Sequence, residues 1–163
     1  QSEVVIEDTD TDLSLEEKLS KVGAELIVKT LQKLEAGTLT ATKQDDSKSC
    51  YAKLLTKAMG QIDWNQCAIS IDRQVRGLYS LPGAYTSCKG KMLKIWQAKP
   101  AEEEGIAAYS MPGSIAKVTK KEIFVQTGDG VLCLQEVQLE GKKRMKVHDF
   151  LLGCKVEEGE VLG

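Results

Sequence analysis

The chain contains few side chains that could catalyse a reaction, and their spacing does not assemble an active site. His148 is the only histidine, and Asp149 follows it directly. Adjacent residues on a helix point in different directions, so this pair is not spaced as an acid–base dyad. Because no nucleophile lies nearby in the sequence, we expect a surface or structural role for His148.

Other groupings of polar residues have simpler explanations than catalysis. Residues 102–104 are three glutamates, which could bind a metal but are typical of a solvated loop. Residues 128–130 (Gly-Asp-Gly) lack the strand and helix that flank a phosphate-binding loop, and they are a strong β-hairpin signal. The five cysteines include no Cys-x-x-Cys pair, so we interpret them as reduced thiols, most of them packing residues. We therefore predict no catalytic residue, no cofactor-binding residue and no metal ligand in this chain.

Basic residues are the positive signal, because they recur in four groups along the chain. Such residues bind a phosphate backbone when the fold brings several groups to one side. The competing interpretation is a set of ordinary solubilising charges, and the sequence leaves both open. The candidate nucleic-acid-binding residues are Lys53, Lys57, Arg73, Arg76, Lys89, Lys91, Lys94, Lys142, Lys143, Arg144 and Lys146.

Aromatic residues could add base stacking to such a surface. Trp96 and Tyr85 lie among the predicted strands, where an aromatic ring more often belongs to the core than to a stacking platform. Trp64 lies on the apolar side of a predicted helix, so we expect it in the core.

Charge is distributed unevenly along the chain, although the net charge is only −2. Residues 1–46 contain eleven acidic and five basic residues, whereas residues 47–163 contain thirteen and seventeen. This split is expected when only the second part faces an anionic partner.

The composition is that of a globular protein, with 42% hydrophobic and 28% charged residues. No apolar run approaches the roughly 20 residues that span a bilayer, and no signal-peptide pattern is present, so we predict a cytoplasmic protein without a membrane segment. The first residue is Gln rather than Met, and we expect a fragment or a processed chain.

The first part of the chain predicts a short strand followed by one long helix. Residues 3–6 are typical of a strand, and Ser14 begins a helix with a capping box to Glu17. Apolar residues continue at helical spacing to Leu34, and Gly37 suits the left-handed position after the last turn. Residues 38–50 have the polar composition of a linker.

The second part predicts a helix followed by short strands. The helix spans about residues 66–76, with Asn65 as its cap, and a short helical piece follows at residues 147–152. Five or more strands within about 80 residues predict a small barrel of the oligonucleotide/oligosaccharide-binding (OB) kind. The predicted extended segments are residues 84–88, 91–98, 113–119, 122–127, 131–139 and 154–162. The predicted fold class is therefore mainly β with flanking helices.

A series of motifs runs in order through nearly the whole chain. They are Gly23-Ala24-Glu25-Leu26, Leu34-Glu35-Ala36-Gly37, Tyr51-Ala52, Leu55-Thr56-Lys57, Gly60, Ile62-Asp63-Trp64, Ile71-Asp72-Arg73 with Arg76, Pro82-Gly83-Ala84-Tyr85-Thr86, Leu93-Lys94-Ile95-Trp96-Gln97-Ala98, Pro112-Gly113, Gly128-Asp129-Gly130, Gly141-Lys142-Lys143-Arg144-Met145 and Gly159-Glu160-Val161-Leu162-Gly163. Together they resemble the carboxyl-terminal part of methionyl-tRNA formyltransferases. The chain departs from that family at Tyr79-Ser80-Leu81, where Asn-Pro-Trp is frequent, and this difference bears on local loop shape.

The resemblance implies a domain organisation. Residues 1–37 would be the last strand and helix at the edge of a truncated Rossmann-like catalytic domain. Residues 38–60 would be a linker, and residues 61–163 an OB-like tRNA-binding barrel.

The resemblance also implies a function in translation initiation. In that family, the amino-terminal domain transfers a formyl group from 10-formyltetrahydrofolate to the amine of methionine on initiator tRNA. The Asn, His and Asp that carry out this step have no counterpart here, so we expect the chain alone to be inactive and to contain no cofactor site. The implied partners are initiator methionyl-tRNA, held by its acceptor arm, and the missing N-terminal catalytic domain.

Two alternatives remain open at this point. One is the matching part of a related folate-dependent enzyme, such as the hydrolase part of formyltetrahydrofolate dehydrogenase or a sugar-amine formyltransferase. The other is a stand-alone nucleic-acid-binding barrel with a helical extension.

Overall fold

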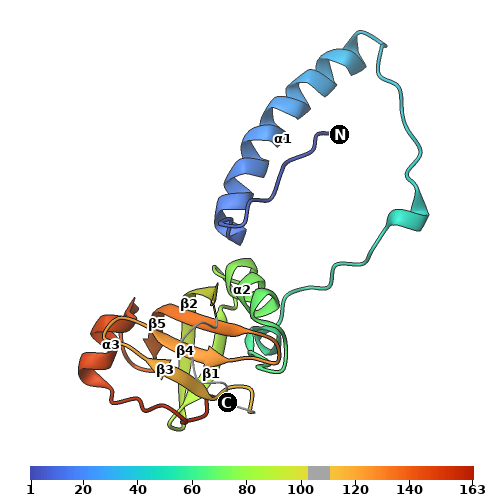
Figure 1. Ribbon diagram of the computed structural model, residues 1–163. Helices are drawn as coiled ribbons and strands as arrows, with labels where there is room; N and C mark the ends of the chain where they lie inside the picture. Colours follow the sequence, from blue (N-terminus) through green and yellow to red (C-terminus); the bar gives the residue numbers. More distant parts are fainter. Residues whose placement is uncertain (103–110) are drawn as a thin grey trace. The chain divides into compact units, whose positions relative to one another are not determined.

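The structure is a computed structural model that describes residues 1–102 and 111–163 (Figure 1). The chain divides into two compact units, Gln1–Leu54 and Leu55–Gly163. Two members of the predicted glutamate run, Glu103 and Glu104, lie outside the described residues.

The first unit consists of one long helix, α1 (Asp12–Glu35), and a short 3-10 turn, η1 (Asp46–Lys48). The helix begins two residues before the predicted start at Ser14. Thr11 is the N-cap, and its hydroxyl accepts from the Ser14 amide at 3.3 Å while the Ser14 hydroxyl accepts from the Thr11 amide at 3.0 Å. Ser14 therefore closes the capping box from within the first turn instead of opening it. Gly37 adopts the predicted left-handed conformation, with φ at 68°.

Two segments of the first unit, residues 3–6 and α1, lack a neighbouring element within that unit. Residues 3–6 are not a strand, in contrast to the prediction, and α1 buries none of its residues. Its apolar side chains are largely exposed, with Leu19 at 49%, Leu31 at 55% and Leu34 at 60%. A strand needs a second strand to satisfy its backbone hydrogen bonds, and an amphipathic helix needs another element to cover its apolar face. The first unit supplies neither of these neighbours.

Asp10 anchors the start of α1. Its carboxylate accepts from Lys18 Nζ at 2.7 Å, from the Glu7 amide at 2.8 Å and from the Ser14 hydroxyl at 2.8 Å. The hydrogen bond from Lys18, followed by those from Glu7 and Ser14, lowers the pKa of Asp10 from 3.8 to about 2.

This lowered pKa makes the start of α1 sensitive to acid. Because the folded carboxyl has the lower pKa, its contribution to helix stability is complete above pH 3.8 and is lost as the pH falls through about 2. We expect a carboxyl titration near 2 by NMR, with α1 helicity falling in the same range by circular dichroism. Asp10→Asn should remove this step, whereas Asp8→Asn, at an exposed position, should leave it. A titration of Asp10 at its ordinary value would contradict the proposed anchor.

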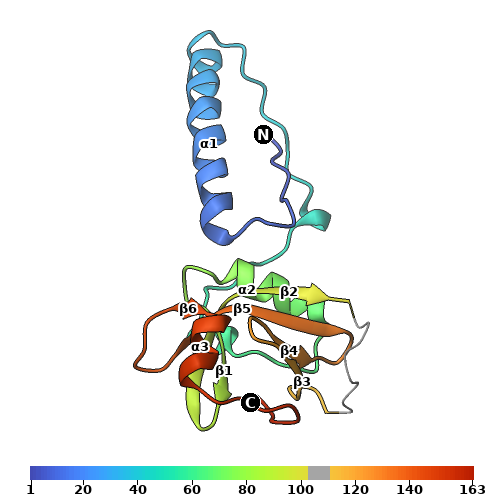
Figure 2. The same cartoon turned by 60° about the vertical axis from the view of Figure 1, so that its left-hand side comes forward.

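In its described residues, the second unit is an antiparallel sheet with two α-helices. The sheet has the order β1-β2-β5-β4-β3, and β6 pairs with β5 beyond this path (Figure 2). The predicted class, mainly β with flanking helices, is confirmed. The elements are η2 (Lys57–Gly60), α2 (Ala68–Gly77), β1 (Ala84–Cys88), β2 (Lys91–Ala101), β3 (Ile115–Val118), β4 (Ile123–Gln126), β5 (Val131–Leu139), β6 (Met145–Lys146) and α3 (Val147–Gly153).

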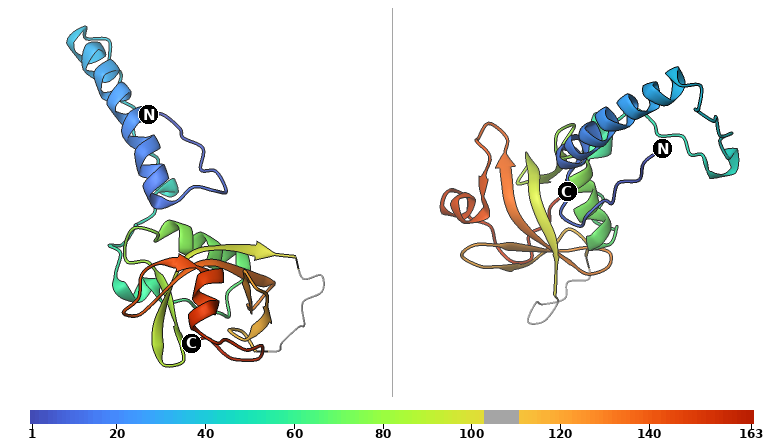
Figure 3. Two further views of the ribbon diagram at one scale, coloured as in Figure 1. Left: turned by 90° about the vertical axis from the view of Figure 1, so that its left-hand side faces the viewer. Right: turned by 90° about the horizontal axis from the view of Figure 1, so that it is seen from above.

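Hydrogen bonds from the C-terminal segment connect the two edges of this sheet. The Ile115 amide donates to Glu160 at 2.7 Å, the Leu162 amide donates to Gly113 at 2.9 Å, and the Gly163 amide donates to Ser87 in β1 at 3.1 Å. Residues 159–163 thus bridge β3 and β1, and Figure 3 shows the curvature of the strands that this bridge completes. The predicted final extended segment forms these bonds without becoming a regular strand.

The core lies inside this curved sheet and under α2. Alternate residues of β1 are buried, as a half-buried strand requires, and α2 buries Ile71 and Val75 against the sheet. Trp64 is 5% exposed, and its indole N–H donates to Thr86 Oγ1 at 3.1 Å, which confirms the predicted core position.

The turn after β4 fixes where α2 begins. The Gly128 amide donates to Trp64 O at 2.8 Å, and the Ala68 amide donates to Asp129 O at 2.9 Å. Asn65, the predicted cap of α2, instead donates its side-chain amide to Asp63 at 2.8 Å. The N-cap is therefore Cys67, two residues later than predicted, because residues 64–66 lie against this turn.

Gly128 is required for this contact, since a Cβ at this position would overlap the carbonyl of Asn65. We expect Gly128→Ala to lower the free energy of unfolding by about 2 kcal/mol, because neither backbone can move without losing the hydrogen bonds between them. Thermal or urea unfolding measures the change. Gly77→Ala, within α2 and open to solvent, is the matched control and should be neutral or stabilising by up to about 1 kcal/mol. Equal stability of the two variants would contradict this role of the turn.

Candidate functional site

His148, Asp149 and the cysteines do not form a catalytic centre in the described part of the chain. His148 and Asp149 do meet, with Nδ1 and Oδ1 3.1 Å apart, although their adjacent positions predicted otherwise. Their side chains are 52% and 61% exposed, so the pair lies in solvent on α3. Cys133 is fully buried, and burial raises the pKa of its thiol to about 12, which leaves it unreactive. Within the described residues, no cluster of three or more His, Cys, Asp or Glu side chains could hold a metal.

A cluster of basic and aromatic side chains lies on the outer face of the sheet. We define the basic-aromatic cluster as Tyr79, Lys94, Trp96, Arg144 and Lys146. The Arg144 guanidinium lies 4.7 Å from the centre of the Trp96 ring and 5.1 Å from that of Tyr79. The two rings meet edge to face, with centres 5.5 Å apart, and Lys94 Nζ lies 6.0 Å from the Trp96 ring. The three distances from a cation to a ring centre are those of cation–π contacts.

Strand pairing brings the cluster together from distant parts of the sequence. In β2 and β5, Lys94 lies opposite Gln138, and in β5 and β6, Glu136 lies opposite Lys146. Inward residues of β2, such as Leu93 and Ile95, are buried, so Lys94 and Trp96 face outward.

Glu136 neutralises part of this positive surface. Its carboxylate lies 2.6 Å from Arg144 Nη2 and 3.7 Å from Lys146 Nζ. The hydrogen bond from Arg144 lowers the pKa of Glu136, and the same bond raises the pKa of Arg144. Arg144 also donates to the Tyr79 hydroxyl at 2.7 Å. Arg144 is therefore held in place by protein groups on several sides.

The basic turn between β5 and β6 is attached to the cluster through Trp96. Its indole N–H donates to Gln138 Oε1 at 3.1 Å, and Gln138 Nε2 donates to the carbonyl of Lys142 at 2.9 Å. This chain of bonds holds the turn in place while Lys142 and Lys143 are exposed. The turn thus presents two lysines beside the cluster.

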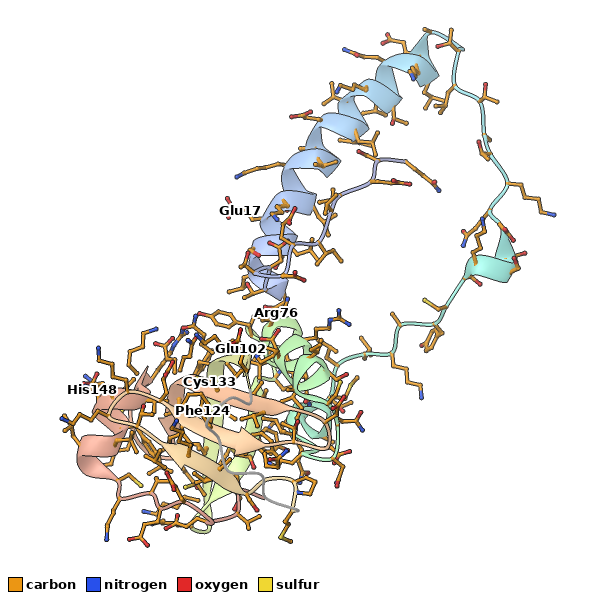
Figure 4. The ribbon with its side chains drawn as sticks, in the orientation of Figure 1. Glu17, Arg76, Glu102, Phe124, Cys133 and His148 are labelled. Carbon is orange, nitrogen blue, oxygen red and sulfur yellow. The ribbon has the colours of Figure 1, made fainter. Side chains whose placement is uncertain are left out.

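The remaining predicted cations are dispersed. Arg76 was expected to share an exposed face with Arg73, but it is half-buried, with its Nε 2.9 Å from Asp72. Lys89 lies 3.0 Å from Glu160 and donates to the carbonyl of Lys155. Internal carboxylates therefore engage four of the predicted cations, counting Arg144 and Lys146. Figure 4 shows Arg76 on α2 well away from His148 on α3.

Three predicted cations stay exposed on other elements, namely Lys57 on η2, Arg73 on α2 and Lys91 at the start of β2. Lys53 belongs to the first unit.

A polar hollow beside the cluster was not predicted. It has a volume of about 630 Å³ and is lined by Gln97, Lys121, Glu122, Gln135, Lys146 and His148. The adjacent Lys120 and Lys121, in the turn between β3 and β4, are the sequence signal that could have revealed it.

The contacts of Arg144 predict a measurable effect on Trp96. Arg144→Ala should uncover the Trp96 ring and leave Glu136 without its main partner, so the free energy of unfolding should fall by about 1–2 kcal/mol. Acrylamide quenching of tryptophan fluorescence should increase, because the other tryptophan, Trp64, is buried. Lys143→Ala, on the same turn, is the control and should change neither quantity. Unchanged quenching in Arg144→Ala would refute the stacked arrangement.

Comparisons with known proteins assign the chain to a family. The model of the formyl transferase C-terminal domain matches residues 54–155, and the chain belongs to this family. The particular relatives that it resembles are methionyl-tRNA formyltransferases, as the motifs predicted. That of Lachnospira eligens is 46% identical over 98% of this chain and 51% of its own length. That of Geobacter metallireducens is 47% identical over 92% of this chain and 47% of its own length. The chain thus spans about half the length of these relatives.

Solved structures with a similar fold include variants of HypX from Aquifex aeolicus. One variant has a TM-score of 0.63 and 18% identity, and the match covers 98% of this chain and 31% of that chain. Another has the same TM-score with 17% identity over 98% and 30% of the two chains. At this identity the likeness concerns the fold alone. Within the described residues, no helix combines the length and apolar character needed to cross a membrane.

Proposed function

We propose that this chain is the C-terminal part of a methionyl-tRNA formyltransferase and that its barrel binds the acceptor arm of initiator methionyl-tRNA. The observation that carries the proposal is 40–47% identity to proteins of that name across nearly the whole chain. The parent enzyme would transfer the formyl group of 10-formyltetrahydrofolate to the methionine amine during translation initiation. A role in translation would place it in the cytoplasm.

The proposed organisation has three parts. Residues 1–37 are the end of the catalytic domain, with α1 as its last helix and residues 3–6 forming its last strand only when the rest of that domain is present. Residues 38–60 are a linker, and residues 61–163 are the OB-like barrel. The exposed apolar face of α1 supports the first part, because such a face is stable only when another layer covers it. The missing N-terminal catalytic domain supplies that layer in this proposal.

The chain contributes to the reaction by positioning. Formyl transfer needs a group that removes the amine proton and donors that stabilise the tetrahedral oxyanion. This proposal assigns both to the missing domain, so the chain alone is inactive. Holding the tRNA in a fixed position can lower the activation free energy by roughly several kcal/mol. This effect does not require contact with the reacting atoms.

The basic-aromatic cluster and the turn beside it are the proposed tRNA surface. Lys142 and Lys143 are exposed, and Lys94 lies over Trp96, so these cations can reach phosphates. Arg144 and Lys146 add charge that Glu136 partly neutralises, and they mainly shape the surface. Lys57, Arg73 and Lys91 are further candidates on neighbouring elements, whereas the ion pairs of Arg76 and Lys89 make them weaker ones.

The test is tRNA binding as a function of salt. We expect the intact chain to bind initiator tRNA, with affinity that falls steeply as salt rises, because bound lysines release counterions. Lys142→Ala combined with Lys143→Ala should weaken binding roughly tenfold at low salt and reduce the log–log salt slope by about 2. Fluorescence anisotropy with labelled tRNA measures both.

The matched control is Lys33→Ala combined with Lys43→Ala, two exposed lysines of the first unit, which should change neither value. Affinity that does not vary with salt, or no binding by the intact chain, would refute the proposed function.

A further inference from the structure

An apolar groove lies beside the basic-aromatic cluster and has no assigned role. It lies between η2, the turn before β1, and the β1–β2 hairpin, and its volume is about 460 Å³. We call it the Tyr85 groove. Its walls include Leu55, Leu81, Tyr85 and Met92, and two lysines, Lys57 and Lys94, also line it.

Packing and hydrogen bonds within the protein define the shape of the groove. The Tyr85 ring packs against Gly60, where an added Cβ would lie 3.1 Å from Cε1. Gln74 of α2 donates to the carbonyls of Met59 at 2.8 Å and Gln61 at 3.1 Å, and the Ile62 amide donates to Tyr85 O at 2.9 Å. These bonds fasten η2 to α2 and to β1, so one wall cannot collapse onto the other.

Both charged residues that line the groove are lysines, and the Glu140 carboxylate outside it accepts from the Met92 amide at 3.2 Å. The lining residues of the groove, all within the described part of the chain, include two lysines and no carboxylate. Leu81 is 74% exposed and Met92 is 44% exposed, so the walls present apolar surface to solvent. A ligand that matches this groove must combine an apolar face with negative charge.

The groove is continuous with the proposed tRNA surface through Lys94. This residue lines the groove, its side chain runs alongside Gly83, and its Nζ lies over the Trp96 ring of the basic-aromatic cluster. The groove and the cluster therefore have one cation in common, and an RNA bound to the cluster lies beside the groove.

We infer that the Tyr85 groove binds one unpaired nucleotide of an RNA partner. The base lies against Tyr85 and the apolar walls, and the adjoining phosphate pairs with Lys57 and Lys94. A base buried in a duplex cannot enter, so the groove distinguishes single-stranded from paired RNA. Contact between a base and an aromatic side chain is worth about 1–3 kcal/mol. The inference rests on the proposed function, because it assumes that the partner is RNA.

The experiment compares two RNA hairpins with the same stem, one with a single-stranded overhang and one with a blunt end. We expect the intact chain to bind the overhang hairpin roughly tenfold more tightly, as the value of one stacked base implies. Leu81→Glu should abolish this preference, since it places a carboxylate in the groove at an exposed position. Leu152→Glu, with the same change of charge at a residue that is 78% exposed on α3, should retain it.

A second variant probes the aromatic wall. Tyr85→Leu keeps the wall apolar but removes the ring, and it should reduce the preference to about twofold or less. Thermal unfolding of each variant confirms that it is folded. Because Leu81 is exposed, Leu81→Glu keeps the test decisive if Tyr85→Leu is unstable.

The outcomes separate the inference from the proposed function. Equal affinity of the intact chain for the two hairpins, with salt-dependent tRNA binding retained, would overturn the inference alone. No binding to any RNA would overturn both. NMR shifts of Tyr85 and Met92 on addition of an acidic, leucine-rich peptide, but not of adenosine monophosphate, would assign the groove to a protein segment and overturn the inference.

Discussion

The structure of the second unit depends on how the two edges of its sheet are joined. β1 and β3 do not pair with each other, and residues 159–163 instead hydrogen-bond to both, through Ser87 of β1 and Ile115 of β3. The Leu162 carbonyl lies so near Gly113 that a Cβ there would come within 2.6 Å of it. The last five residues of the chain thus take the place of a strand and leave the core closed.

Closure of the sheet separates an apolar interior from a polar outer face, and the proposed tRNA surface lies on that outer face. Trp96 belongs to this face although it is a large aromatic residue in a strand. Arg144 covers one side of it, and Gln138 meets its indole N–H. The ring therefore organises cations instead of filling the core. Glu136 orients Arg144 through their ion pair, and its negative charge offsets part of the positive charge of Arg144 and Lys146.

The first unit illustrates a different physical situation. Its helix is well capped, with Asp10 and Thr11 satisfying groups at the start of α1, yet no other element of the first unit covers its apolar face. Local bonds are enough to define where a helix begins, whereas burial needs a second layer. This contrast accords with the proposal that α1 completes a larger domain.

Local patterns in the sequence were sufficient to predict the fold class and most of the helices and strands. The β1–β2 hairpin, β5 and the capped helix α1 were all predicted with nearly correct bounds, because turn residues and apolar periodicity act within a few residues. The resemblance to methionyl-tRNA formyltransferases likewise came from motifs spread along the chain, and the comparisons confirmed it. The predicted cap Asn65 was wrong because Gly128, over sixty positions away, packs against its backbone.

Residue patterns alone were enough to predict that positive charge is concentrated after residue 46 and that Trp64 is buried. The three-dimensional fold was needed to show which cations are engaged by carboxylates. Arg76 is paired within its own helix, but Lys89 and Glu160 join the β1–β2 turn to the C-terminal segment, and Arg144 and Glu136 meet across the β5–β6 turn. It also decided that Trp96, Tyr79 and Arg144 meet, and that η2 and the β1–β2 hairpin enclose a groove. The physical reason is that these contacts join residues distant in sequence, and a pattern read along one segment carries no information about its partner.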